Sequence, residues 1–188
     1  MSRTAVTEAP IVDLLATRWS PRSYDPTAVL TIDDLRASFE AARWAPSANN
    51  LQPWQFIVGF RGDDTFNAIA GALAGYNSAW APDAAALVVN LAEVVTADGK
   101  PNTYAQYDLG QAVAHFTVQA TADGYFVHQM GGYDAAAIAE KLGVESPWEV
   151  TSVMTVGPRG DADRLPEGGL YEREVAPRVR KPLDEVVR

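Results

Sequence analysis

The sequence predicts one α/β or α+β domain in which helices cover both faces of a single sheet. Three observations support this prediction. The length of 188 residues suits one domain, and 47% hydrophobic with 21% charged residues is typical of a folded protein. Helical and strand-like hydrophobic patterns also alternate along the chain. We therefore expect residues 1–188 to form one domain.

The expected helices are marked by apolar residues that recur every three or four positions. They cover residues 10–18, 31–44, 63–74, 104–122 and 134–143. Pro10 fits the first position of a helix, with Ile11, Leu14 and Leu15 on one face. Thr31-Ile-Asp-Asp34 resembles a capping box, and Asp134 fits an N-cap.

The expected strands cover residues 55–60, 84–92, 125–130 and 150–157. Residues 84–92 are apolar almost throughout, which indicates a strand covered on both faces. Residues 158–188 are rich in proline, glycine and charge, so we expect them to contribute no core. They form the last segment of the predicted domain.

Charge and composition exclude several classes of function. The net charge of −9 argues against nucleic-acid or anionic-membrane surfaces, which need clustered cations. The absence of cysteine excludes disulfides, thiolate nucleophiles and zinc–thiolate sites. The N-terminus lacks a signal-peptide pattern, and no apolar run approaches about 20 residues. We expect a cytoplasmic protein with neither a membrane segment nor a metal site.

The cations are unusual in type and in placement. Twelve are arginines and three are lysines, and none of the arginines falls between Arg61 and Arg159. Arginine suits phosphate or carboxylate because its planar fork donates two parallel hydrogen bonds. Basic chain ends are also common on solvated surfaces. The Rossmann glycine fingerprint, the P-loop and the Gly-x-Ser-x-Gly motif are absent.

Two motifs carry the alternating arginines. Arg18, Ser20 and Arg22 follow the first helix at every second position, so in extended chain they point to one side. Arg178 and Arg180 repeat this spacing in the last segment, before Lys181. Each pair could form part of an anion pocket, and each could equally be a solvated edge or a basic tail.

Two further motifs lie at ends of expected strands. Ala45-Pro-Ser-Ala-Asn-Asn-Leu-Gln-Pro-Trp54 places several hydroxyl and amide groups directly before a strand, where ligands often bind. Turn geometry alone could also explain such a loop. Gly131 and Gly132 join a strand to a helix and would let a flat ring or a phosphate approach the backbone, although a tight turn is an equally good explanation.

Taken together, these motifs resemble the nitroreductase-like family of FMN-dependent NAD(P)H oxidoreductases over nearly the whole chain. The block A-P-S-A-N-N-L-Q-P-W-Q-F-I-V is the specific part, and Asp108-Leu-Gly-Gln-Ala112 is similar to the family's D-x-G-x-A segment. The resemblance implies an α+β, three-layer fold with a central, mostly antiparallel sheet of four to five strands flanked by helices. It also implies a homodimer with FMN at the interface and a C-terminal extension, residues 158–188, that wraps around the partner subunit.

The resemblance also implies roles for individual residues. Arg18, Ser20, Arg178 and Arg180 would surround the FMN phosphate, and the loop after the second helix would reach the flavin of the other subunit. Arg22 would lie near the pyrimidine edge and is the candidate for stabilising the reduced flavin. The full expected set of FMN contacts is Arg18, Trp19 (through its backbone), Ser20, Arg22, Pro46, Ser47, Asn50, Gln52, Asn77, Met130, Gly131, Gly132, Arg178 and Arg180.

The implied activity is reduction of nitroaromatics, quinones or related small substrates by NADH or NADPH in a ping-pong mechanism, with the flavin supplying the reactive centre. The alternatives are another flavin enzyme of this fold, such as a dehydrogenase, dehalogenase or flavin-cleaving enzyme, and a non-catalytic FMN-binding module. Trp80 stands where many relatives have a lysine, so it could narrow the pocket. His115 is expected to be packed or at an interface, and His128 could approach the ring.

Overall fold

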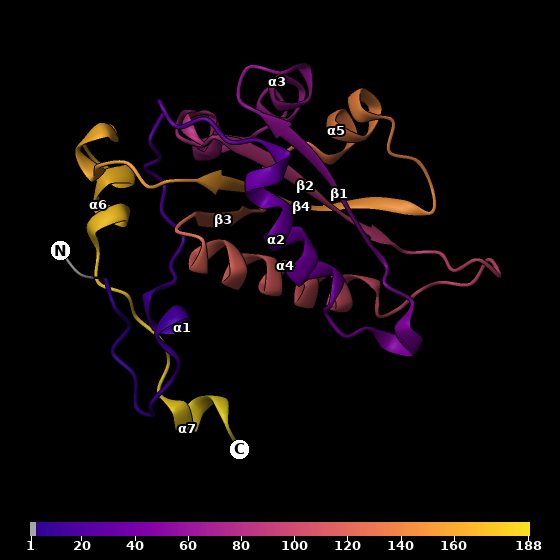
Figure 1. The fold of residues 1–188 in the computed structure, drawn as a ribbon, viewed down its shortest axis with the longest axis horizontal. Coiled ribbons are helices and arrows are strands. Elements are labelled where there is room, and N and C mark those ends of the chain that lie inside the picture. Colours follow the sequence, from indigo (N-terminus) through magenta and orange to yellow (C-terminus); the bar gives the residue numbers. More distant parts are fainter. Residues whose placement is uncertain (1–2) are drawn as a thin grey trace.

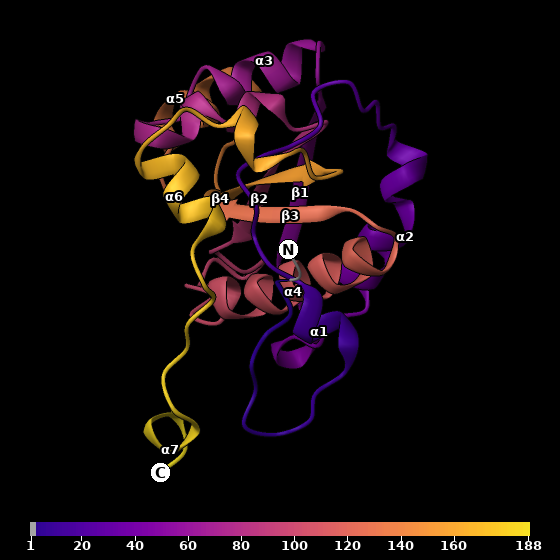
Figure 2. The same cartoon turned by 90° about the vertical axis from the view of Figure 1, so that its left-hand side faces the viewer.

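The computed structural model describes residues 3–188 and places a four-stranded antiparallel sheet between two layers of helices (Figures 1 and 2). The strands are β1 (Trp54–Phe60), β2 (Ala86–Glu93), β3 (Phe126–Met130) and β4 (Trp148–Gly157), in the order β1-β2-β4-β3. This confirms the α+β prediction and all four expected strands to within two residues.

The helices divide between the two faces of the sheet. One face is covered by α2 (Ile32–Arg43) and α4 (Ala105–Ala122), and the other by α3 (Asp64–Ala70), α5 (Ala135–Leu142) and α6 (Gly169–Val175). β2 is buried along nearly its whole length, as its continuous apolar sequence predicts, because both layers pack on it. Two short helices, α1 (Asp13–Thr17) and α7 (Leu183–Val186), lie below this body in Figure 2.

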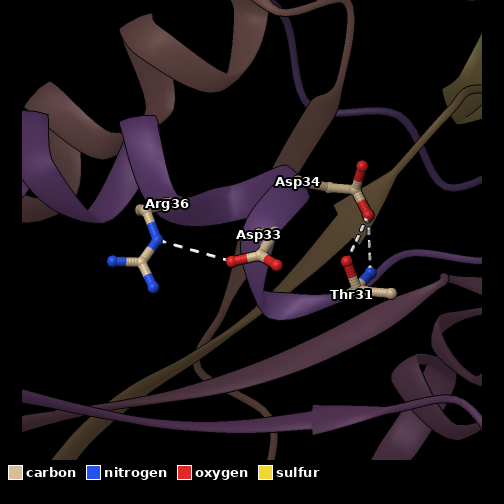
Figure 3. A network of polar contacts seen from close by, with 4 residues as sticks. All are labelled: Thr31, Asp33, Asp34 and Arg36. Carbon is tan, nitrogen blue, oxygen red and sulfur yellow. Dashed lines mark hydrogen bonds and ion pairs between the residues drawn. The ribbon is translucent and has the colours of Figure 1, made fainter.

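The predicted capping box at the start of α2 is confirmed (Figure 3). The backbone N–H and the hydroxyl of Thr31 both donate to Oδ2 of Asp34, each at 2.7 Å. One turn of the helix also carries an exposed ion pair between Asp33 and Arg36. The box satisfies N-terminal backbone donors that have no partner within the helix, so α2 begins where the sequence predicts.

Two expected helices are shorter in the structure. The first begins at Asp13 and not at Pro10, and Ile11, Leu14 and Leu15 remain exposed in the single chain. The helix expected over residues 63–74 ends at Ala70, because Gly71 caps it and the chain turns toward residue 73. In both cases the hydrophobic spacing extends beyond the helix, and spacing alone does not show where the backbone hydrogen bonds of a helix begin or end.

The prediction for residues 158–188 is wrong in one respect. Leu165 and Leu170 are buried in the core layer beneath α3 and α5, and Glu174 on α6 is also buried. Leu165, Leu170 and Glu174 are therefore buried among mostly exposed neighbours, and residues 179–188 are all exposed. Within residues 3–188, none of the helices combines the length and hydrophobicity needed to cross a lipid bilayer.

Candidate functional site

A cavity of about 380 Å³ lies between the N-terminal segment, which lines it with residues 5–18, and the C-terminal segment, which lines it with residues 178–186. Four cationic side chains line it, namely Arg18, Arg178, Arg180 and Lys181, with Glu8 as the acidic member. Burial lowers the pKa of Arg18, and the nearby charge of Arg180 lowers it further. The structure thus brings Arg18 of the first arginine motif together with Arg178 and Arg180 of the second, about 160 residues away, in one electropositive site.

Arg178 holds the two segments together. Its Nη1 donates to the carbonyl oxygens of Arg3 and Ala16, both at 2.7 Å, and its Nη2 donates to the carbonyl oxygen of Arg18 at 2.8 Å. A guanidinium has five N–H groups, so these three bonds leave two of them unused. The sequence predicts a phosphate contact for Arg178 but gives no sign of this attachment to backbone carbonyls.

The rest of the first motif lies beside this cavity. Nη1 of Arg18 is 3.4 Å from Oγ of Ser20, so both polar groups face the same region. Trp19 is buried, with the Arg3 guanidinium 4.0 Å from its ring centroid and the ring of Phe126 at 6.3 Å on an edge. Its side chain anchors the motif, which leaves the Trp19 backbone for the contact that the resemblance implies.

Arg22 lies on the other side of this motif, between α6 and β3. Its backbone N–H donates to Oε2 of Glu174 at 2.7 Å. The preceding carbonyl, that of Pro21, is 2.8 Å from Nδ1 of His128. Burial is the largest cause of the lowered pKa of Arg22, and the carboxylate of Glu174 partly offsets it.

His128 does not point at open solvent. Burial lowers its pKa from 6.5 to about 4, and its ring lies 4.6 Å from that of Trp80. A neutral imidazole that bonds to the Pro21 carbonyl must donate from Nδ1, which makes His128 a support for the Arg22 segment. His115, by contrast, is exposed on α4, so the expectation that it packs inside the chain is wrong and only the interface alternative remains.

Trp80 is 2% exposed and stacks on Tyr24, with the two ring centroids 6.2 Å apart. The hydroxyl of Tyr24 accepts a hydrogen bond from Thr155 on β4. The hypothesis that Trp80 narrows a ligand pocket is therefore wrong, because its side chain belongs to the core. Stacking on Tyr24 and the contact with the ring of His128 bury the apolar surface of this indole.

The glycine turn after β3 lies against Asn77. Nδ2 of Asn77 donates to the carbonyl oxygen of Gly132 at 3.1 Å, and a Cβ added to Gly132 would lie 2.8 Å from that nitrogen. A Cβ on Gly131 would meet nothing within 4 Å, while the neighbouring Met130 is buried. A side chain at 132 would therefore displace the Asn77 amide, whereas position 131 has open space.

The amide-rich loop, residues 45–54, carries the second group of expected FMN contacts. Three of its residues, Asn49, Asn50 and Gln52, have positive φ values of 50, 56 and 53°. The backbone N–H of Ala48 donates to Oδ2 of Asp108 at 2.9 Å, and the N–H of Gln52 donates to Oγ of Ser47 at 3.0 Å. The first contact fixes the loop to the first turn of α4, and the second closes the loop on itself. Left-handed backbone at non-glycine residues is frequent at ligand sites.

Within one chain the two halves do not meet. Ser47, Asn50 and Gln52, together with Pro46, lie at the N-terminal end of α4, whereas α1 and the last segment lie toward its other end (Figure 1). α4 has 18 residues, which corresponds to about 27 Å. The structure therefore brings together the arginine motifs and, separately, Asn77 with the glycine turn, but leaves the amide-rich loop apart.

Comparisons with known proteins agree with this fold and these motifs. Residues 15–77 match the model of the nitroreductase family. A solved structure described as an oxidoreductase containing FMN is 32% identical, with a TM-score of 0.92 over 100% of this chain and 96% of the other. YdgI of Bacillus subtilis strain 168, whose name proposes an NAD(P)H nitroreductase activity, is 25% identical over 80% of this chain and 88% of its own.

A further relative is a 15.4 kDa protein from the ask 5′ region of Mycolicibacterium smegmatis, whose name states no activity. It is 34% identical over 70% of this chain and 92% of its own length. The structure combines a three-layer α+β fold built on an antiparallel sheet with a cavity lined by cations from both chain ends. The chain belongs to the nitroreductase family.

Proposed function

We propose that this protein is an FMN-dependent oxidoreductase that accepts electrons from NADH or NADPH and passes them to small oxidised substrates such as nitroaromatics or quinones. The cavity lined by Arg18, Arg178, Arg180 and Lys181 is the observation that carries this proposal. It is supported by membership of the family, by the FMN in the similar solved structure and by the name of YdgI.

The residues present fit FMN. The cavity holds four cations against one carboxylate. Burial and then the charge of Arg180 lower the pKa of Arg18, and burial followed by the charges of Arg18 and Arg180 lowers the pKa of Arg178, so an anion placed among them relieves repulsion. A phosphate dianion bound by several charge-assisted donors suits this arrangement. The open backbone at Gly131 likewise suits the approach of a flat ring.

When bound, FMN supplies the redox chemistry. Arg18, Ser20 and Arg180 would bind its phosphate, with the free N–H groups of Arg178 beside them. Arg22 would stabilise negative charge on the pyrimidine part of the reduced ring. Asn77 holds the Gly132 carbonyl, so the turn that carries Met130 and Gly131 keeps its shape when a ring lies against it.

We also propose that the active form is a homodimer in which Pro46, Ser47, Asn50 and Gln52 of one subunit complete the site of the other. The length of α4 between the two halves supports this, since one chain cannot close the site. Aromatic side chains are also exposed at the start of α4, with the N-cap residue Tyr104 at 59% and Tyr107 in the first turn at 69%. Leu183 and Val186 on α7 are exposed too, as expected for an extension that wraps around the partner.

FMN binding tests the cofactor. The unloaded protein is titrated with FMN while flavin fluorescence is followed, for the wild type, Arg18→Gln and Arg180→Gln. Each substitution removes charge-assisted hydrogen bonds of about 1.5–3 kcal/mol, so each should weaken binding by about 10- to 150-fold. Arg36→Gln, an exposed arginine on α2, is the matched control. Wild-type protein that binds no FMN, or equal affinity in all four proteins, contradicts the proposal.

Rapid mixing of the FMN-loaded protein with NADH and with NADPH tests the reaction. Loss of the oxidised flavin absorbance with either one supports the oxidoreductase. Tight FMN binding without bleaching by either nucleotide favours another flavin enzyme of this fold or a binding module.

The oligomeric state tests the interface. Ala114 is exposed on the outer face of α4, and Ala136 is exposed on α5 in the opposite layer. Sedimentation should show that Ala114→Arg converts a dimer to a monomer and weakens FMN binding, whereas Ala136→Arg changes neither. A wild-type monomer that binds FMN would contradict the shared site.

We further propose that the protein works as one domain in the cytoplasm.

A further inference from the structure

A buried carboxylate from the C-terminal segment contacts the backbone of the arginine motif. Glu174 on α6 is 3% exposed, and its Oε2 accepts the backbone N–H of Arg22 at 2.7 Å. Burial raises the pKa of Glu174, while backbone hydrogen bonds from Arg22 and Ser23 favour its charged form. A buried carboxylate with this environment is costly unless its hydrogen bonds and nearby cations compensate for lost water.

The guanidinium of Arg22 lies in a strongly cationic region. Arg173 and Arg3 both lower the pKa of Arg22, and Glu174 is the one acid that raises it among the residues the structure describes. The buried carboxylate of Glu174 lies 2.7 Å from the Arg22 backbone nitrogen, so its charge partly offsets the charge that Arg22 presents to a ligand.

The backbone around Arg22 is also fixed from the opposite side. His128 on β3 bonds to the Pro21 carbonyl, and the hydroxyl of Ser23 donates to the Asp161 carbonyl at 2.5 Å. The segment is thus held between β3, α6 and the loop after β4. Of the side chains that hold it, only the carboxylate of Glu174 carries a full charge next to Arg22.

We propose that Glu174 is a positioning residue for Arg22: it fixes the backbone at Arg22 and partly neutralises the guanidinium, and so limits how strongly the site favours the reduced flavin. This inference rests on the proposed function, which places Arg22 at the flavin. Glu174→Gln keeps an oxygen that can accept the Arg22 N–H but removes the negative charge. Because reduced FMN is the more negative form, removing that charge should favour reduction.

The midpoint potential of bound FMN measures this effect. In Glu174→Gln the ratio of affinities for reduced and oxidised FMN should rise about tenfold, which is a positive shift of about 30 mV for a two-electron couple. Glu172→Gln is the matched control, since Glu172 is an exposed acid on the same helix. Glu174→Gln is also made in an Arg22→Gln protein, which tests whether Glu174 acts through Arg22. The shift in midpoint potential caused by Glu174→Gln should then fall to less than half of the shift seen when Arg22 is present.

Three outcomes would overturn the proposal: an unchanged or more negative potential in Glu174→Gln, an equal shift in Glu172→Gln, or a full shift in the Arg22→Gln background. If Glu174→Gln does not fold, Glu174→Asp replaces it, because it keeps the charge but draws the carboxylate back from Arg22. A smaller positive shift is then expected, and no shift contradicts the proposal.

Hydrogen exchange in the FMN-free protein separates this inference from the proposed function. The Arg22 amide should exchange slowly in the wild type and faster in Glu174→Asp, whether or not the protein binds FMN. An Arg22 amide that exchanges as fast as an exposed loop overturns the positioning role. Failure of the proposed function would instead appear as wild-type protein that takes up no FMN.

Discussion

Replacing Arg178 with methionine would remove the guanidinium that attaches the C-terminal segment to the N-terminal segment, while keeping most of the aliphatic side chain. Three hydrogen bonds to backbone carbonyls, at 2.7, 2.7 and 2.8 Å, would be lost. A hydrogen bond with one charged partner contributes about 1.5–3 kcal/mol. Because Arg178 is only partly buried, we expect the free energy of opening the segment to fall by about 2–4 kcal/mol in total.

Hydrogen exchange over residues 176–188 measures that opening. A loss of 2–4 kcal/mol corresponds to amide exchange that is about 30- to 700-fold faster. Arg180→Met is the control, because Nη1 of Arg180 donates to the carbonyl of the adjacent Val179 and attaches the segment to nothing else among the described residues. Wild-type protection in Arg178→Met, or equal loss of protection in both variants, would refute the assignment of Arg178 as the attachment.

Two further predictions concern the turn after β3 and the buried histidine. Gly132→Ala places a Cβ 2.8 Å from Nδ2 of Asn77 and should lower the free energy of unfolding by about 1–3 kcal/mol. The Tm should therefore fall in Gly132→Ala and stay unchanged in the control Gly131→Ala. Equal Tm values in the two variants would show that the turn accommodates a side chain at residue 132. Burial lowers the pKa of His128 from 6.5 to about 4. Between pH 6.5 and pH 4 this histidine is therefore protonated in the unfolded chain but neutral in the folded protein. The free energy of unfolding should fall as the pH falls through this range, by at most about 3 kcal/mol. Urea unfolding at pH 7 and at pH 4.5 should show this loss in the wild type and in His115→Asn but much less of it in His128→Asn; the same loss in all three would contradict it.

The sequence predicts most of the fold because the hydrophobic spacing and the caps agree. Thr31, Asp134 and Gly143 each lie at the helix end that the sequence assigns to them, and both cap contacts to Asp side chains are formed. The errors occur where local spacing and tertiary packing disagree. Leu14 has helical spacing but remains exposed, and Leu170 lies in a polar segment but is buried under the sheet.

The site is predicted less completely than the fold, for a physical reason. The arginines at both chain ends are recognisable because guanidinium groups suit anions, and the structure brings them together. Glu174 and His128 are not recognisable from sequence in this role, because each acts through a backbone N–H or carbonyl of residues 21–22. A backbone partner leaves no pattern of residue types, and contacts across about 107 and 152 positions leave no local spacing.

The contacts of the C-terminal segment show that the proposed phosphate site depends on this segment being in place. Arg178 binds the carbonyl of Arg18, and Glu174 binds the N–H of Arg22, so both arginines of the first motif depend on residues 174–178. The cavity itself has walls from both chain ends. Detachment of residues 176–188 would therefore dismantle the proposed phosphate site, while the sheet and helices α2 to α6 remain folded. The clustered cations repel one another, and the acidic body of a chain with net charge −9 and an anion held between the cations both offset that repulsion.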